Sequence, residues 1–190
     1  MAAPGPSNRL SLTLGLVIAA VVLAAGASSR FGSPKQALLL PGVLARVRAS
    51  SVDDIVVVLG AHDVESDARI VRCPDWERGP GASLRCGLAG LGADVEAAVV
   101  VLADGPNLAP GAVDRVIEAW HVFGTEVVAA SYRGDRGHPV LLARAAWDRV
   151  PDEGARALTP LLVPCDDVGA PGDVDTADDL GRYGLSPEEP

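Results

Sequence analysis

The sequence predicts an α/β protein with three-layer α/β/α architecture, in which helices cover both faces of a mostly parallel sheet. Two observations support this prediction. Short runs rich in valine alternate along the chain with stretches of helical periodicity. The runs are apolar almost throughout, which is typical of parallel strands that are buried on both faces. Ligands of such sheets bind at the carboxyl ends of the strands, so we expect a functional site there.

The individual elements follow from these runs and from helix-end signals. Strands are expected at Leu16–Leu23, Asp54–Leu59, Ala97–Leu102 and Glu126–Ser131. Helices are expected at Ala82–Leu91, Pro110–Phe123 and Thr176–Tyr183, from leucines at helical spacing, a first-turn proline and a threonine cap respectively. The stretch Tyr132–Leu142 is interpreted as a glycine-rich loop that leads into a strand.

Length and composition indicate one globular domain. The chain has 190 residues, of which 48% are hydrophobic and 22% charged, and this composition argues against disorder. We place the domain at residues 12–185, with tails at 1–11 and 186–190. The formal net charge of −9 argues against nucleic acid as a partner. A bound nucleotide would therefore need a local cationic pocket, for which Arg30 and Lys35 are candidates.

The three cysteines, Cys73, Cys86 and Cys165, form no C-x-x-C pair and are odd in number. We therefore predict buried, reduced thiols in a cytoplasmic protein without a disulfide framework.

The apolar segment Leu10–Gly26 has two interpretations that are nearly even on this segment alone. It resembles the core of a signal peptide with Arg9 as a basic flank, although it is too short for a membrane helix. It is also typical of a buried central strand that ends in a glycine turn. The segment that follows decides for the strand, because cleavage there would destroy it. We therefore expect a cytoplasmic protein with no membrane partner.

That following segment, LAAGASSRFGSPK, extends from Leu23 to Lys35. Glycines let backbone N–H groups approach phosphate oxygens, and Arg30 and Lys35 would neutralise a triphosphate. The spacing fits neither the Walker pattern nor G-x-G-x-x-G. By composition alone, a glycine turn with two solvated basic residues explains the segment equally well.

Acidic residues supply candidate metal ligands in two places. Asp104 follows a strongly apolar strand, where a carboxylate could hold Mg²⁺ beside phosphates, although an ordinary Asp-Gly turn is the commoner explanation. Asp173 and Asp175 are two residues apart, so in an extended chain both point to one side and either could complete the site. The alternative is that Asp175 or Thr176 caps the helix that begins there, and both roles can coexist.

Two weaker candidates complete the set. Ser83 and Arg85 in GASLRCGL lie at a predicted helix start, a natural anion or ribose site, although an arginine such as Arg85 more often forms a surface salt bridge. His138 could contact substrate, but a lone histidine before proline is usually structural.

No Ser/His/Asp or Cys/His set occurs at an informative spacing. The chemistry that these pieces support is nucleotidyl transfer, which needs positioning and charge neutralisation more than a nucleophile.

In combination, the motifs resemble those of the MobA-like nucleotidyltransferases, especially their molybdenum-cofactor cytidylyltransferase branch. LAAG-x-S-x-R-x-G-x-P-K resembles the family signature. Further resemblances follow in order: VVLGAH, PDWERGPGASLRCGL, VLADGP, RGHPVLL, GARAL and DVDTADDL. The resemblance extends from about Leu16 to Tyr183.

The resemblance implies a three-layer, Rossmann-like fold related to the GT-A glycosyltransferases. It implies CTP or GTP as donor, Mg²⁺ as cofactor, and the terminal phosphate of molybdopterin as acceptor, with pyrophosphate leaving; a molybdoenzyme would receive the product. By position, it makes Arg30, Lys35 and Asp104 catalytic, and Asp104 and Asp175 metal ligands, with Asp173 as the further candidate from its spacing. The nucleotide-binding residues would be Leu23, Ala24, Ala25, Gly26, Arg30, Lys35, Ser83 and Arg85. The A-A-G version and Pro34 favour cytidylyl over guanylyl transfer.

The sequence also departs from the family pattern. The segment after Lys35 is shorter than usual, and Gly105 and Asn107 replace the common residues after Asp104. Two rivals follow: a relative with oxidoreductase activity, and a non-catalytic module that binds a nucleotide or cofactor.

Overall fold

A computed structural model describes residues 16–27, 35–169 and 172. Its centre is a seven-stranded sheet with the order β3-β2-β1-β4-β6-β5-β7. The strands are β1 (Val17–Ala24), β2 (Asp54–Leu59), β3 (Arg69–Arg72), β4 (Val95–Leu102), β5 (Val127–Tyr132), β6 (Asp135–Ala143) and β7 (Leu161–Pro164). All neighbours pair in parallel except β6, which is antiparallel to β4 and β5. The predicted mostly parallel sheet is confirmed.

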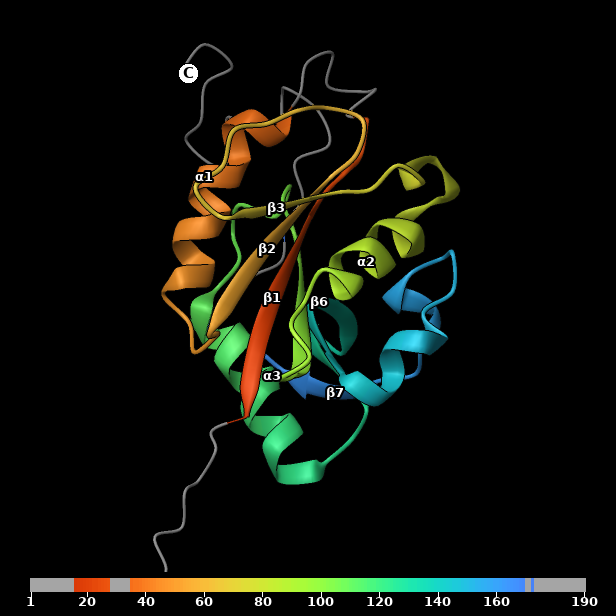
Figure 1. Cartoon of the computed structure of the whole chain (residues 1–190). Coiled ribbons are helices and arrows are strands. Elements are labelled where there is room, and N and C mark those ends of the chain that lie inside the picture. The colour runs from red at the N-terminus through yellow and green to blue at the C-terminus, as the bar shows by residue number, and fades with distance from the viewer. Residues whose placement is uncertain (1–15, 28–34, 170–171, 173–190) are drawn as a thin grey trace, which may run out of the picture.

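Helices cover both faces of this sheet, as Figure 1 shows. The helices α1 (Lys35–Arg48) and α3 (Pro110–Phe123) lie on one face, and α2 (Pro80–Ala89) lies on the other. Short 3₁₀ turns follow at η1 (Trp76–Arg78), η2 (Arg144–Arg149) and η3 (Ala155–Ala157). The three-layer prediction is therefore confirmed. None of the helices in the described ranges has the length and apolarity that a bilayer span requires.

Strand β1 explains why the valine-rich runs do not alternate. Ile18, Ala20 and Val22 pack into the core beneath α1 and α3. Ala19 and Val21 pack into the second core beneath α2. Because both faces of the strand are covered, nearly every position of β1 must be apolar, and the run reads as continuous instead of alternating.

The structure places several elements differently from the sequence prediction. Strand β2 and helix α3 have the predicted bounds, and the strands β1, β4 and β5 shift by one or two residues at their ends. Helix α2 begins and ends two residues earlier than predicted, because Pro80 occupies its first turn. The elements α1, β3 and β7 were not predicted. The predicted helix Thr176–Tyr183 lies outside the described residues.

Helix α1 was missed because Pro41 and Gly42 interrupt its sequence. The proline lies inside the 14-residue helix and removes a backbone donor there. Leu40, Val43, Leu44 and Val47 nevertheless follow helical spacing and are almost fully buried against the sheet. Packing of this apolar stripe therefore outweighs the local cost of the proline.

The expectation of three reduced thiols is wrong for two of them. Cys73 and Cys86 form a disulfide that ties the segment after β3 to α2, while Cys165 is free and buried. Their sequence separation of 13 residues had no diagnostic pattern, so the pairing depends on the fold.

Helix α2 packs so closely on β1 and β2 that Gly87 has no room for a side chain. A Cβ there would lie 2.5 Å from Val21 and 2.7 Å from Val58. We predict that Gly87→Ala lowers the free energy of unfolding by about 1–3 kcal/mol through overpacking. Urea unfolding measures the change. Gly42→Ala is the matched control: it has no atom within 4 Å of the new Cβ and should stabilise α1 by about 0.5–1 kcal/mol. An unchanged free energy of unfolding in Gly87→Ala would contradict this packing.

The disulfide gives a second prediction. Alkylation of the denatured, unreduced protein should modify one cysteine, Cys165, and alkylation after reduction should modify all three. Reduction should also lower the thermal midpoint, because a cross-link of this loop length contributes about 3 kcal/mol by restricting the unfolded chain. Intact-mass spectrometry counts the modified thiols. Three modified cysteines without reduction would contradict the pairing.

Candidate nucleotide-binding site

The site is built at the edge where the three central strands end. Because β2, β1 and β4 are parallel, Ala24 lies beside Leu59, and Leu23 lies beside Leu102. The loops that leave these strands are then joined by backbone hydrogen bonds. The N–H of Ala103 donates to the carbonyl of Leu23 at 3.0 Å, and the N–H of Ala61 donates to that of Ala25 at 3.1 Å. The end of β1 is thus the centre of the site.

The loop after β1 is held by side chains from two other elements. The Nε2 atom of Gln36 donates to the carbonyl oxygen of Gly26 at 2.7 Å, and His62 Nε2 lies 2.9 Å from the carbonyl oxygen of Ala27. Ala24 and Ala25 are buried, whereas Gly26 and Ala27 are exposed. The exposed backbone at Gly26 is where a ligand could reach the loop. Arg30, predicted to hold the triphosphate, lies outside the described residues.

Lys35 and Asp104, two of the three predicted catalytic residues, are in direct contact. The Nζ atom of Lys35 lies 2.9 Å from Oδ2 of Asp104, across 69 positions of sequence. Their side chains are 10% and 30% exposed, so the pair is only partly screened by solvent. Lys35 begins α1 and Asp104 lies two residues beyond β4, so the contact depends on the strand order of the sheet.

Asp104 fits one part of a Mg²⁺ site. Mg²⁺ is commonly held by one or two carboxylates together with substrate phosphates and waters. Asp104 offers such a carboxylate at the strand edge and retains access to solvent. Within residues 16–27, 35–169 and 172, no group of three or more acidic, histidine or cysteine residues forms a preassembled metal site. Asp173 and Asp175 lie outside these ranges, so their predicted roles stay predictions.

Trp76, in the 3₁₀ turn that precedes α2, lies at the same edge. Gly60, just after β2, lies so close to Trp76 and to the Ala25 carbonyl that a Cβ there would meet both within 2.7 Å. Ser83 is buried in the first half of α2. Arg85 forms the salt bridge that was its alternative interpretation.

Both nitrogens at the end of the Arg85 guanidinium have protein partners. NH2 lies 2.5 Å from Asp152 Oδ1, and NH1 donates to the carbonyl of Val150 at 2.7 Å. The hydrogen bond from Arg85 to Asp152, with the positive charges of Arg78 and Arg85, holds the pKa of Asp152 below its usual range. A nucleotide role for Ser83 and Arg85 remains a prediction.

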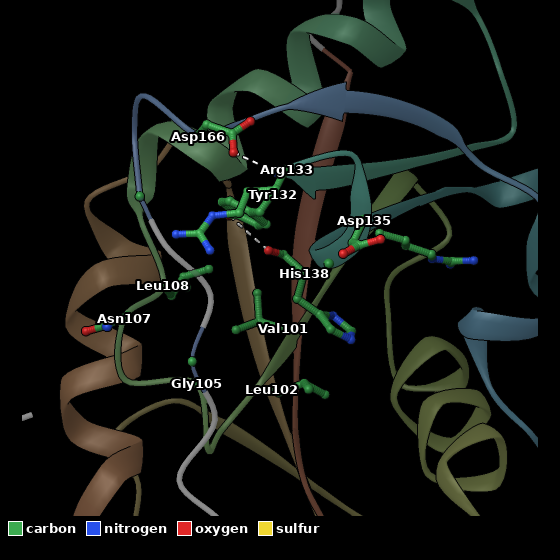
Figure 2. Close-up of a pocket in the computed structure, with 14 residues that line it drawn as sticks. Val101, Leu102, Gly105, Asn107, Leu108, Tyr132, Arg133, Asp135, His138 and Asp166 are labelled. Carbon is green, nitrogen blue, oxygen red and sulfur yellow. Dashed lines mark hydrogen bonds between the residues drawn. The ribbon is translucent and has the colours of Figure 1, made fainter. Parts of the chain in front are cut away.

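A cavity of about 570 Å³ opens beside Asp104, between the ends of β4 and β5 and the start of β6. Figure 2 shows His138, Tyr132 and Arg133 arranged around it. His138 Nδ1 lies 3.5 Å from the carbonyl oxygen of Val100, and burial lowers the pKa of the imidazole. His138 is therefore neutral at physiological pH.

Sequence reasoning singled out only His138 among the polar residues that line this cavity. Tyr132, Arg133 and Asp166 were not proposed as site residues. The phenol of Tyr132 donates to the carbonyl of His138 at 3.2 Å, and burial raises its pKa to about 12, so it remains a donor. The available signal was Arg133-Gly134, a two-residue turn between strand-like runs, which predicts a hairpin.

Solved structures share this architecture. Rv0371c from Mycobacterium tuberculosis H37Rv is 29% identical with a TM-score of 0.74, and the match covers 88% of this chain and 97% of that one. A complex of Rv0371c with manganese gives 27% identity and a TM-score of 0.70, covering 87% and 97% of the two chains. A nucleotidyl transferase from Methanothermobacter thermautotroptrophicus shares the fold at 21% identity with a TM-score of 0.68, covering 89% and 96%. None of the curated proteins matches this chain.

Together with this three-layer fold, the match to a family model of NTP transferases makes the chain a nucleotidyltransferase. The family model of the MobA-like NTP transferase domain matches residues 20–163. The chain therefore belongs to the MobA-like NTP transferase family. Membership of this family implies a nucleoside triphosphate as one substrate.

Proposed function

We propose that this enzyme transfers CMP, or alternatively GMP, from its triphosphate to the terminal phosphate of molybdopterin and releases pyrophosphate. The observation that carries the proposal is the 2.9 Å contact between Lys35 and Asp104. It brings a cation suited to phosphates and a carboxylate suited to a divalent metal to one point, beside the exposed backbone of Gly26. The A-A-G loop favours cytidylyl transfer. The reaction belongs in the cytoplasm, and a molybdoenzyme would receive the product.

The chain's own residues have separate tasks in this reaction. Backbone N–H groups of the loop after β1 would bind phosphate oxygens, and Lys35 and Arg30 would neutralise the leaving pyrophosphate. Asp104, with Asp173 or Asp175, would hold Mg²⁺, which neutralises charge on the phosphates when it is bound. An oxygen of the acceptor phosphate forms a bond to the α-phosphorus, and the bond from that phosphorus to the bridging oxygen of the β-phosphate breaks. No protein nucleophile is required.

The Lys35–Asp104 ion pair must also open when substrate binds. With a triphosphate present, Lys35 would exchange its carboxylate partner for phosphate oxygens, and Asp104 would then be available to hold the metal. Each exchange replaces one favourable charge contact by another, so neither group is left buried without a counter-charge. Donor and metal should therefore bind cooperatively.

The central test is pyrophosphate release from CTP or GTP in the presence of Mg²⁺ and molybdopterin. We predict that Asp104→Asn lowers the turnover rate by about a hundredfold or more, because the amide cannot balance the metal charge. The substitution keeps the side-chain shape, so the thermal midpoint serves as a folding control. Unchanged release in the variant would remove Asp104 from the mechanism. Nucleotide binding without any release, measured by calorimetry, would favour the non-catalytic module.

A second prediction concerns the ion pair itself. Lys35→Met should bind Mn²⁺ more tightly than the wild type when nucleotide is absent, because a competing cation 2.9 Å from Asp104 is removed. The same variant should bind CTP more weakly, because a phosphate partner is lost. Electron paramagnetic resonance of Mn²⁺ and calorimetry of CTP measure the two affinities. An unchanged or weaker Mn²⁺ affinity in Lys35→Met would contradict this competition for Asp104.

A further inference from the structure

We propose that the cavity beside the β5–β6 hairpin is the acceptor subsite and that Arg133 binds an anionic phosphate group of the acceptor there. The inference rests on the proposed function, because it assigns the second substrate of that reaction to a place. It follows from the backbone of the hairpin, the direction of one guanidinium and the position of the cavity relative to Asp104.

The backbone of Arg133 is held in an unusual conformation. Among the described residues, Arg133 is the one non-glycine residue with a positive φ, 54°. Side chains of L-residues rarely adopt this left-handed region, and positions that do are concentrated at functional sites. The carboxylate of Asp166 fixes the conformation by accepting the Arg133 N–H at 2.7 Å. Glycine adopts this conformation without strain, yet the position holds an arginine, and its side chain is exposed.

The guanidinium of Arg133 points across the cavity. Figure 2 shows it directed toward Leu108, on the loop that follows Asp104. The side chain is exposed, and within the described ranges it forms no ion pair or side-chain hydrogen bond.

Arg136 is the second arginine of the cavity lining, but its guanidinium is bound to backbone carbonyls of the protein. Its guanidinium donates to the carbonyls of Leu158 at 2.7 Å, Ala155 at 2.8 Å and Arg156 at 3.1 Å. Arg136 therefore anchors η3 to the sheet, and Arg133 is the arginine that can meet a ligand.

The cavity places this guanidinium near the reaction centre. Its lining includes Leu102 and Gly105, which flank Asp104 on both sides, as well as Arg133. An acceptor in the cavity therefore reaches the edge at which the nucleotide is proposed to bind. Guanidinium groups bind phosphate through two parallel hydrogen bonds, so Arg133 suits a phosphomonoester dianion.

Two acidic residues also line the cavity, Asp166 after β7 and Asp135 on the hairpin. One oxygen of Asp166 is already committed to the Arg133 N–H. Asp135 lies on the opposite side of Tyr132 and His138 from the guanidinium in Figure 2. Among the arginines of the described lining, Arg133 is thus the one whose guanidinium is available to an anionic group, and Asp135 lies away from it. A phosphate of the acceptor would bind at Arg133.

The test uses two variants of the full chain. Arg133→Gly removes the guanidinium and at the same time relieves the left-handed backbone, so the fold is not at risk. Arg133→Lys keeps the charge without the two-pronged geometry. We expect Arg133→Gly to raise KM for molybdopterin about tenfold or more, with kcat and the affinity for CTP little changed. Arg133→Lys should give an intermediate KM.

Arg72→Gln is the matched control, since it removes one positive charge at the β3 edge, where Arg72 pairs with Asp63. An unchanged KM in Arg133→Gly, or an equal change in Arg72→Gln, would overturn the proposal. If the wild type shows no turnover, the proposed function fails and calorimetry decides this inference separately. Molybdopterin should then bind the wild type in the presence of a non-hydrolysable CTP analogue and bind Arg133→Gly more weakly. Equal affinities, or no binding to either protein, would overturn the assignment.

Discussion

Burial of β1 on both faces is the constraint on which the remaining structure depends. The strand lies between β2 and β4 with parallel register on each side, and helices on both faces leave almost none of it exposed to solvent. Such a strand must be continuously apolar, and it must end where polar backbone can again meet solvent or ligand. The loop at Gly26 is that end. The position of the proposed nucleotide site therefore follows from the burial that stabilises the fold.

The same constraint explains why two distant residues form one charged pair. Because β1 and β4 run in the same direction, the chain leaves both at one edge, which brings the residues after each strand together. Lys35 enters from the start of α1 and Asp104 from the loop after β4. Each charged group is partly removed from water, and the opposite charge of its partner compensates for the lost hydration. A substrate that offers both a polyanion and a metal can replace both partners at once, and this couples fold stability to recognition.

The sequence predicted elements whose local signals agree with their tertiary setting. Strand β2 has a valine run, and α3 has a first-turn proline and an apolar stripe, so both were placed with correct bounds. Helix α1 was missed because Pro41 contradicts the helix locally and only packing resolves the conflict. The Lys35–Asp104 contact was predicted as two separate candidates, since their distance depends on strand order. The Cys73–Cys86 bond and the role of Arg136 depend on contacts between segments that carry no local pattern.

The reversed direction of β6 places a second feature, the β5–β6 hairpin, at the carboxyl edge of the parallel strands. In a wholly parallel sheet, the start of β6 would lie at the amino edge, far from Asp104. Because β6 is antiparallel, Tyr132 pairs with Asp135 at the hairpin, and Val100 pairs with Val140, so the hairpin lies at the edge where β4 ends. The parallel half of the sheet supplies the loop suited to a nucleotide, and the reversed strand supplies a second cavity beside it. Two substrates that must meet at one phosphorus atom require two such adjacent places, and one inverted strand is sufficient to provide them.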